Sequence, residues 1–69
     1  MITFKNNELK ERAYSYYWDF DEIENMLKQY DVCKNAKSCE VYKVCNHAIC
    51  LTIDGVNYRL DIEGNLSEV

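Results

Sequence analysis

The stretch "HAICLTIDGVNYRLDI", residues 47–62, decides the fold because it carries the clearest turn signal in the chain. Its centre, Asp54-Gly55, is a residue pair that two-residue hairpin turns favour, and apolar residues alternate with other residues on either side of it. We expect the following apolar side chains to share one face of the two strands: Ile49, Leu51, Ile53, Val56, Tyr58, Leu60 and Ile62. The segment therefore predicts an antiparallel β-hairpin.

A third strand is predicted before the hairpin, over "EVYKV" at residues 40–44. Asn46-His47 then forms a second two-residue turn, which places Cys45 opposite Ala48. The sheet is thus expected to be either a β-hairpin or a three-stranded antiparallel meander.

A helix is predicted over residues 8–18, with Asn7 as its N-cap. Its apolar stripe, at 3.6-residue spacing, consists of Leu9, Ala13, Tyr16 and Phe20. One continuous helix over residues 8–30 is the competing interpretation.

A second helix is predicted to start at Asp19, a favourable N-cap residue, with Trp18 and Ile23 as a hydrophobic staple. Its apolar face consists of Ile23, Met26, Leu27 and Tyr30. The prediction is therefore one α+β domain, residues 1–69, in which two N-terminal helices pack on a small antiparallel sheet.

The chain length limits what the core can contribute to stability. A single core in 69 residues rarely supplies more than about 3–5 kcal/mol, and natural domains of this size often add disulfides, a metal or a partner. We expect the additional stabilisation here to come from zinc.

The composition also bears on compartment and partners. The start, "MITFKNNELK", lacks the apolar stretch of a signal peptide, and no segment reaches the roughly 20 apolar residues of a membrane span. We therefore expect a cytoplasmic protein without membrane contact, whose thiols stay reduced. The net charge of −4 argues against direct nucleic-acid binding and favours a basic protein partner.

All four cysteines lie within 18 residues, together with the only histidine, His47. The cysteines are Cys33, Cys39, Cys45 and Cys50. In a reducing compartment such a cluster favours a structural Zn²⁺ site, although the spacing lacks the C-x2-C turn of a zinc knuckle. Four free thiols, or one or two disulfides, remain as alternatives.

Strand geometry bears on the zinc ligand set. Six residues of straight strand separate Cys39 from Cys45 by about 20 Å. Both can ligate one ion only if the strand bends, and otherwise His47 must replace Cys39. The alternative role for His47 is that of a turn residue.

No catalytic set is evident, and we expect no enzymatic activity. Side-chain alternation directs His47 and Cys50 to opposite faces, and no third group is evident to orient a pair of Cys45 and His47. The chain also lacks a phosphate-cradling glycine loop and a nucleophile elbow.

The segment "YSYYWDFDEIE", residues 14–24, supplies a candidate partner-binding surface. Tyr14 and Trp18 lie four residues apart, on the side of the first helix away from its apolar stripe. Tyrosine and tryptophan are enriched among interface hot spots. The acidic side chains expected beside them are Asp21, Glu22 and Glu24. The alternative is that the staple buries Trp18 and that Tyr14 lies flat on the surface.

The whole chain resembles the small phage-encoded anti-CRISPR proteins, particularly inhibitors of Cas9-type effectors. The segments that carry this resemblance are "YYWDFDEIE" (residues 16–24) and "CKNAKSCEVYKVCNHAIC" (residues 33–50). The resemblance implies a stoichiometric inhibitor in the host bacterial cytoplasm. Its implied partner is a large basic nucleic-acid-handling protein of the Cas9 type, whose nucleic-acid loading or cleavage it blocks. Proteins of this kind share no diagnostic motif, so no residue role carries over by position.

Two other functions stay open. A zinc-stabilised nucleic-acid-binding or regulatory module would present Lys34, Lys37, Lys43 and Arg59 to phosphates. Steeply salt-dependent DNA binding would favour that module. An antitoxin-like partner protein would look the same in sequence as the inhibitor.

Overall fold

The computed structural model describes residues 2–69. The helices are α1 (Asn7–Ser15), α2 (Phe20–Leu27) and α3 (Asp31–Lys34). The strands are β1 (Thr3–Phe4), β2 (Cys39–Val44), β3 (Ala48–Ile53), β4 (Val56–Asp61) and β5 (Leu66–Glu68). The predicted α+β class is confirmed.

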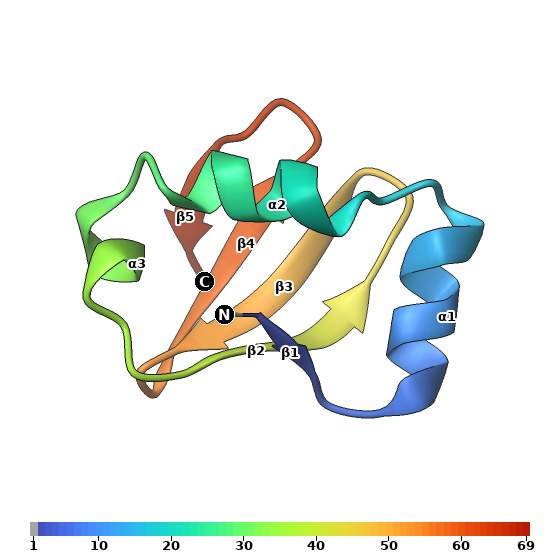
Figure 1. The fold of residues 1–69 in the computed structure, drawn as a ribbon, viewed down its shortest axis with the longest axis horizontal. Helices are drawn as coiled ribbons and strands as arrows, with labels where there is room; N and C mark the ends of the chain where they lie inside the picture. The colour runs from blue at the N-terminus through green and yellow to red at the C-terminus, as the bar shows by residue number, and fades with distance from the viewer. Residues whose placement is uncertain (1) are drawn as a thin grey trace.

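The strands form one sheet in the order β1-β2-β3-β4-β5 (Figure 1). β1 pairs with β2 in parallel, and the other neighbouring strands pair antiparallel. The predicted meander therefore corresponds to the three central strands, β2 to β4. The sheet is larger than predicted and mixed, because β1 and β5 add one short strand to each edge.

The β3–β4 hairpin is confirmed. Ile53 pairs with Val56, and the two residues between them, Asp54 and Gly55, have φ angles of 47° and 87°. Positive φ at both central positions is what a type I′ turn requires. The Oδ1 atom of Asp54 also accepts the two backbone N–H groups of residues 37–38, each at 2.9 Å. The turn thereby anchors the segment that enters β2.

β2 is the predicted third strand, but a β-bulge interrupts its pairing with β3. Val41 pairs with Leu51 and Lys43 pairs with Cys50, so Tyr42 is the extra residue. The bulge shifts the alternation of side chains, so that residues before and after it no longer share a face at the expected spacing.

α1 and α2 are separate helices, as predicted, and the competing interpretation of one continuous helix over residues 8–30 is wrong. α1 ends in a turn in which Trp18 N–H donates to the Ala13 carbonyl oxygen at 2.9 Å and Tyr17 N–H donates to that of Tyr14 at 3.0 Å. This pair of hydrogen bonds is the Schellman motif. Tyr17, with φ of 64°, occupies the left-handed position that is usually glycine.

The N-caps explain where both helices begin. Asp19 caps α2 as predicted, because its Oδ1 accepts the Asp21 N–H at 2.8 Å. The N-cap of α1 is Asn6 rather than Asn7, since Asn6 Oδ1 accepts the Leu9 N–H at 3.0 Å. α1 also ends at Ser15, earlier than predicted.

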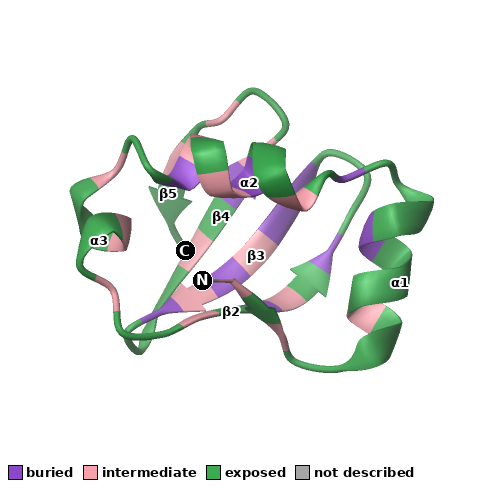
Figure 2. Cartoon of the chain, in the orientation of Figure 1, coloured by how far each residue is buried: buried purple, intermediate pink, exposed green. Residues whose placement is uncertain are grey.

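The hydrophobic core joins the helices to the sheet, with α2 lying across one sheet face (Figures 1 and 2). The fully buried members are Ala13, Ile23, Val41, Ile49, Leu51 and Leu60. Burial of each large aliphatic side chain among them contributes about 1.5–3 kcal/mol. Three residues expected on apolar faces are exposed instead: Tyr16, Val56 and Ile62.

Candidate functional site

A groove lies on the surface between the end of α1 and the start of α2. We call it the aromatic groove, and its lining residues are Tyr14, Tyr17, Trp18, Asp19, Phe20 and Asp21. Because the Schellman turn redirects the chain between the two helices, side chains from both helices line one opening.

Phe20 holds the aromatic rings of this region together. Its ring centroid lies 5.0 Å from that of Tyr14 and 5.1 Å from that of Phe4, which are ordinary distances for aromatic pairs. The Nζ atom of Lys10 lies 5.7 Å from the same centroid, within the range of a cation–π contact. Tyr14 is thus held in place by Phe20 while 57% of its surface stays exposed.

Tyr17 is the most exposed large side chain of the groove, at 93%. Its hydroxyl has no hydrogen-bond partner within residues 2–69. Tyr17 was not among the predicted site residues, because the four-residue helical spacing favoured the pair Tyr14 and Trp18. The unbroken run Tyr16-Tyr17-Trp18 was the available signal, but its left-handed backbone is visible only in the structure.

Trp18 is buried, as the alternative with a hydrophobic staple predicted. It is only 7% exposed and belongs to the same core cluster as Ile23. Its Nε1–H donates to the carbonyl oxygen of Cys45 at 3.0 Å. Trp18 therefore ties the α1–α2 connection to the end of β2 and offers the groove only a small part of its surface.

The three predicted acidic residues lie in three different places. Asp21 lines the groove together with Asp19, and Glu22 is exposed in the first turn of α2 without lining it. Glu24 is half-buried and lines a different pocket. No ion-pair partner is found for any of these four carboxylates in the part of the chain that the structure describes, where the observed ion pair joins Lys34 to Asp31 at 3.5 Å.

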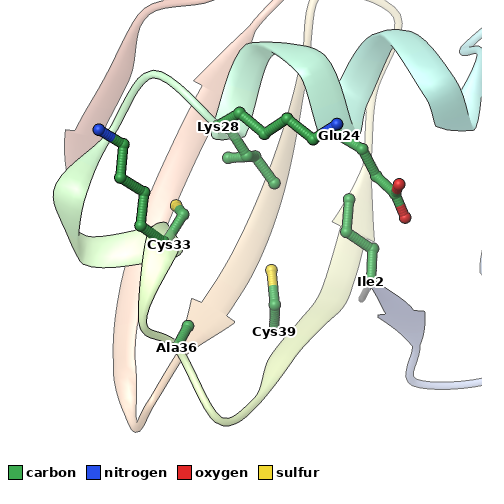
Figure 3. Close-up of a pocket in the computed structure, with 8 residues that line it drawn as sticks. Ile2, Glu24, Lys28, Cys33, Ala36 and Cys39 are labelled. Atoms are coloured by element: carbon green, nitrogen blue, oxygen red, sulfur yellow. The ribbon is translucent and has the colours of Figure 1, made fainter.

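The second pocket, which we call the thiol pocket, lies between α2, α3 and the start of β2 (Figure 3). It encloses about 280 Å³, and its lining residues are Ile2, Glu24, Leu27, Lys28, Cys33, Lys34, Ala36 and Cys39. Figure 3 shows Cys33 and Cys39 among the side chains that line it. Burial raises the pKa of Cys33. Burial and, to a smaller extent, the neighbouring Cys33 raise the pKa of Cys39 to about 11.

Cys45 and Cys50 lie away from the thiol pocket. Cys50 alternates with the buried Ile49 and Leu51, so it faces the side of the sheet opposite the core. There, desolvation and the neighbouring Cys50 thiol raise the pKa of Tyr42. Cys45 is exposed and lies opposite Ala48 as predicted, with its N–H donating to the Ala48 carbonyl oxygen at 2.9 Å.

The β-bulge separates the predicted zinc ligands. Cys39 pairs with the core residue Ile53, whereas Cys45 follows the bulge and lies on the face of Cys50. His47 is exposed in the turn. Within residues 2–69 no group of three or more His, Cys, Asp or Glu side chains is placed to hold a metal. A single four-cysteine site would need a different arrangement of these strands, and zinc binding stays a prediction that elemental analysis tests.

Among the helices of residues 2–69, none is both long and apolar enough to cross a membrane.

Neither a protein-family model, nor a curated protein, nor a solved structure matches this chain.

Proposed function

We propose that this protein is a non-catalytic binding module that docks on its partner through the aromatic groove. Its partner would be a large basic nucleic-acid-handling protein, and the resemblance to anti-CRISPR proteins selects a Cas9-type effector nuclease as the first candidate. Bound there, the protein acts as a stoichiometric inhibitor of nucleic-acid loading or cleavage.

The observation that carries this proposal is the combination of backbone strain and exposure at Tyr17. A residue with a side chain in the left-handed conformation costs roughly 1–2 kcal/mol relative to the right-handed one, whereas glycine adopts it freely. Tyr17 has φ of 64°, and with 93% of its surface exposed it recovers little of that cost by packing. Its side chain is therefore better explained by a contact outside the chain than by folding.

The neighbouring groups suit a protein interface. Tyrosine offers a large contact area with few rotatable bonds, so it anchors a partner at little entropic cost. Asp19 and Asp21 add negative charge beside the rings, which complements a basic partner and speeds association. The net charge of −4 acts in the same direction.

The basic side chains support the nucleic-acid alternative less well. Lys34 and Lys37 lie in and after α3. Lys43 and Arg59 instead both pair with Cys50 in the sheet, on the face opposite the core. The four cations are thus divided between two regions, and a continuous phosphate-binding stripe would need them on one.

The test is a DNA-cleavage assay in which the protein is titrated against a purified Cas9-type nuclease loaded with guide RNA. We expect inhibition that saturates at equimolar protein. Tyr17→Ala removes the ring and should weaken inhibition by about tenfold or more, as expected for an interface anchor.

Val56→Ala is the matched control, because Val56 is an exposed apolar residue on β4 (41%) that does not line the groove. It should inhibit like the parent. Cleavage that is unaffected by excess parent protein would reject this partner, and equal inhibition by parent and Tyr17→Ala would reject the groove as the interface.

A further inference from the structure

We infer that the aromatic groove is a receptor for an arginine side chain of the partner. This inference rests on the proposed function, since it names the chemical group that the proposed interface recognises. It starts from the fact that the groove combines aromatic rings and carboxylates in one opening.

The rings provide the faces on which a planar cation stacks. Tyr14 and Tyr17 both line the groove and are 57% and 93% exposed. The adjoining Phe20 ring already has the Lys10 ammonium at 5.7 Å from its centroid. The ring cluster therefore accommodates a cation within the chain itself, and a guanidinium group stacks on aromatic faces better than an ammonium does.

The carboxylates provide the hydrogen-bond acceptors. Asp19 Oδ1 is engaged by the Asp21 N–H at 2.8 Å, while no hydrogen bond or ion pair to the Asp21 carboxylate is found within residues 2–69. Asp21 thus has both oxygens available for a bidentate contact, the geometry that arginine matches and lysine does not. The positive charges near the groove are about half a charge at the start of α2 and one charge on Lys10, whose Nζ lies 5.7 Å from the Phe20 centroid. Asp19 and Asp21 carry two negative charges, so the balance stays negative.

An apolar or acidic occupant fits the groove less well. An apolar side chain would desolvate Asp19 and Asp21 without giving either a partner, which is unfavourable for a charged group. An acidic side chain would add a third negative charge. Charge complementarity therefore selects a cation, and the flat rings select arginine among the cations.

The inference is tested by nuclear magnetic resonance titration of the isotope-labelled protein with acetyl-Gly-Arg-Gly-amide. The comparison peptide carries citrulline, which keeps the shape of arginine and lacks its charge. We expect the signals of residues 14–21 to shift saturably with the arginine peptide, and the citrulline peptide to bind at least about tenfold more weakly, as expected when a charge-assisted contact is lost.

Asp21→Asn should weaken binding of the arginine peptide by about tenfold, which corresponds to the loss of one charge-assisted hydrogen bond. Glu63→Gln is the matched control, because it removes the same charge at an exposed residue in the connection between β4 and β5. It should bind like the parent.

Equal binding of the arginine and citrulline peptides, or no effect of Asp21→Asn, would overturn the inference. If the arginine peptide fails while Tyr17→Ala still abolishes nuclease inhibition, the groove is the interface but recognises another group. If the arginine peptide binds while no nuclease is inhibited, the arginine receptor stands and the proposed partner is rejected.

Discussion

Two residues other than glycine have positive φ angles within residues 2–69, Tyr17 and Asp54, and they differ in what the fold gains from them. Asp54 forms the β3–β4 turn, and its carboxylate holds the backbone at residues 37–38 through two hydrogen bonds of 2.9 Å. Aspartate also tolerates the left-handed conformation better than most residues do. Tyr17 has neither advantage, which is why its presence points to a function.

The cysteines give a prediction at the same scale. With a thiol-alkylating reagent at pH 8, we expect Cys45 to react fastest, because it is exposed, and Cys39 to react slowest. The pKa of Cys39 is raised to about 11 by burial and by Cys33, so little of the reactive thiolate is present at pH 8. The alkylation rate of Cys39 should therefore keep rising as the pH increases toward 11.

Mass spectrometry of time points, with each cysteine identified by its peptide, measures these rates. The control is the same reaction in denaturant, where the four rates should become similar because burial is lost. A native Cys39 that reacts as fast as Cys45 would show that the thiol pocket is open to solvent and reagent.

Among the secondary-structure elements, Tyr30, which follows α2, connects this helix to the edge strand β5. The hydroxyl of Tyr30 donates to the Gly64 carbonyl oxygen and accepts the Leu66 N–H at 3.0 Å. One side chain thereby fixes both the turn before β5 and the first residue of that strand. β5 is short and lies at the edge of the sheet, so it depends on such contacts.

Tyr30→Phe should lower the free energy of unfolding by about 1–3 kcal/mol, because a partly buried N–H and carbonyl lose their partner. Denaturant titration measures the change. Tyr16→Phe is the matched control, since Tyr16 is exposed at 42% and no partner of its hydroxyl is found in the described chain. If both variants unfold at the same denaturant concentration, the Tyr30 contacts do not stabilise the fold.

The central hairpin and the N-cap of α2 could be predicted because their signals are local. Asp54-Gly55 specifies its own turn, and Asp19 caps the helix that directly follows it. β1 has no such local signal, because its two residues form a strand only through pairing with Glu40 and Val41, far along the chain. The edge strands thus depend on tertiary contacts that no short sequence pattern encodes.

The candidate sites were less predictable than the fold for two specific reasons. The bulge at Tyr42 reverses the faces of the residues that follow it, so the spacing of Cys39 and Cys45 did not reveal that they point apart. A Schellman turn usually contains glycine, and Tyr17 holds that position in α1. The helix end was therefore predicted only from the N-cap signal at Asp19, and it was placed at residue 18 instead of Ser15.

At the scale of the whole molecule, the proposed interface must extend beyond the groove. A standard interface covers about 800 Å² on each partner, and the whole surface of this protein measures 4800 Å². About a sixth of the surface is therefore needed, which includes the exposed residues next to the groove, such as Tyr16 and Glu22. The extents of 29 × 23 × 21 Å suit a small inhibitor that occupies one cleft of a much larger partner.

The most direct test is a paired measurement on Tyr17→Gly: its free energy of unfolding and its affinity for the proposed Cas9-type partner. Glycine relieves the left-handed strain, so the variant should be more stable by about 1 kcal/mol, while affinity should fall about tenfold or more because the anchor ring is lost. Asp54→Asn is the control, because it changes the other strained position, keeps an acceptor and should leave affinity unchanged. A Tyr17→Gly variant that binds as tightly as the parent would contradict the account, since the exposed and strained tyrosine would then have no role in partner binding.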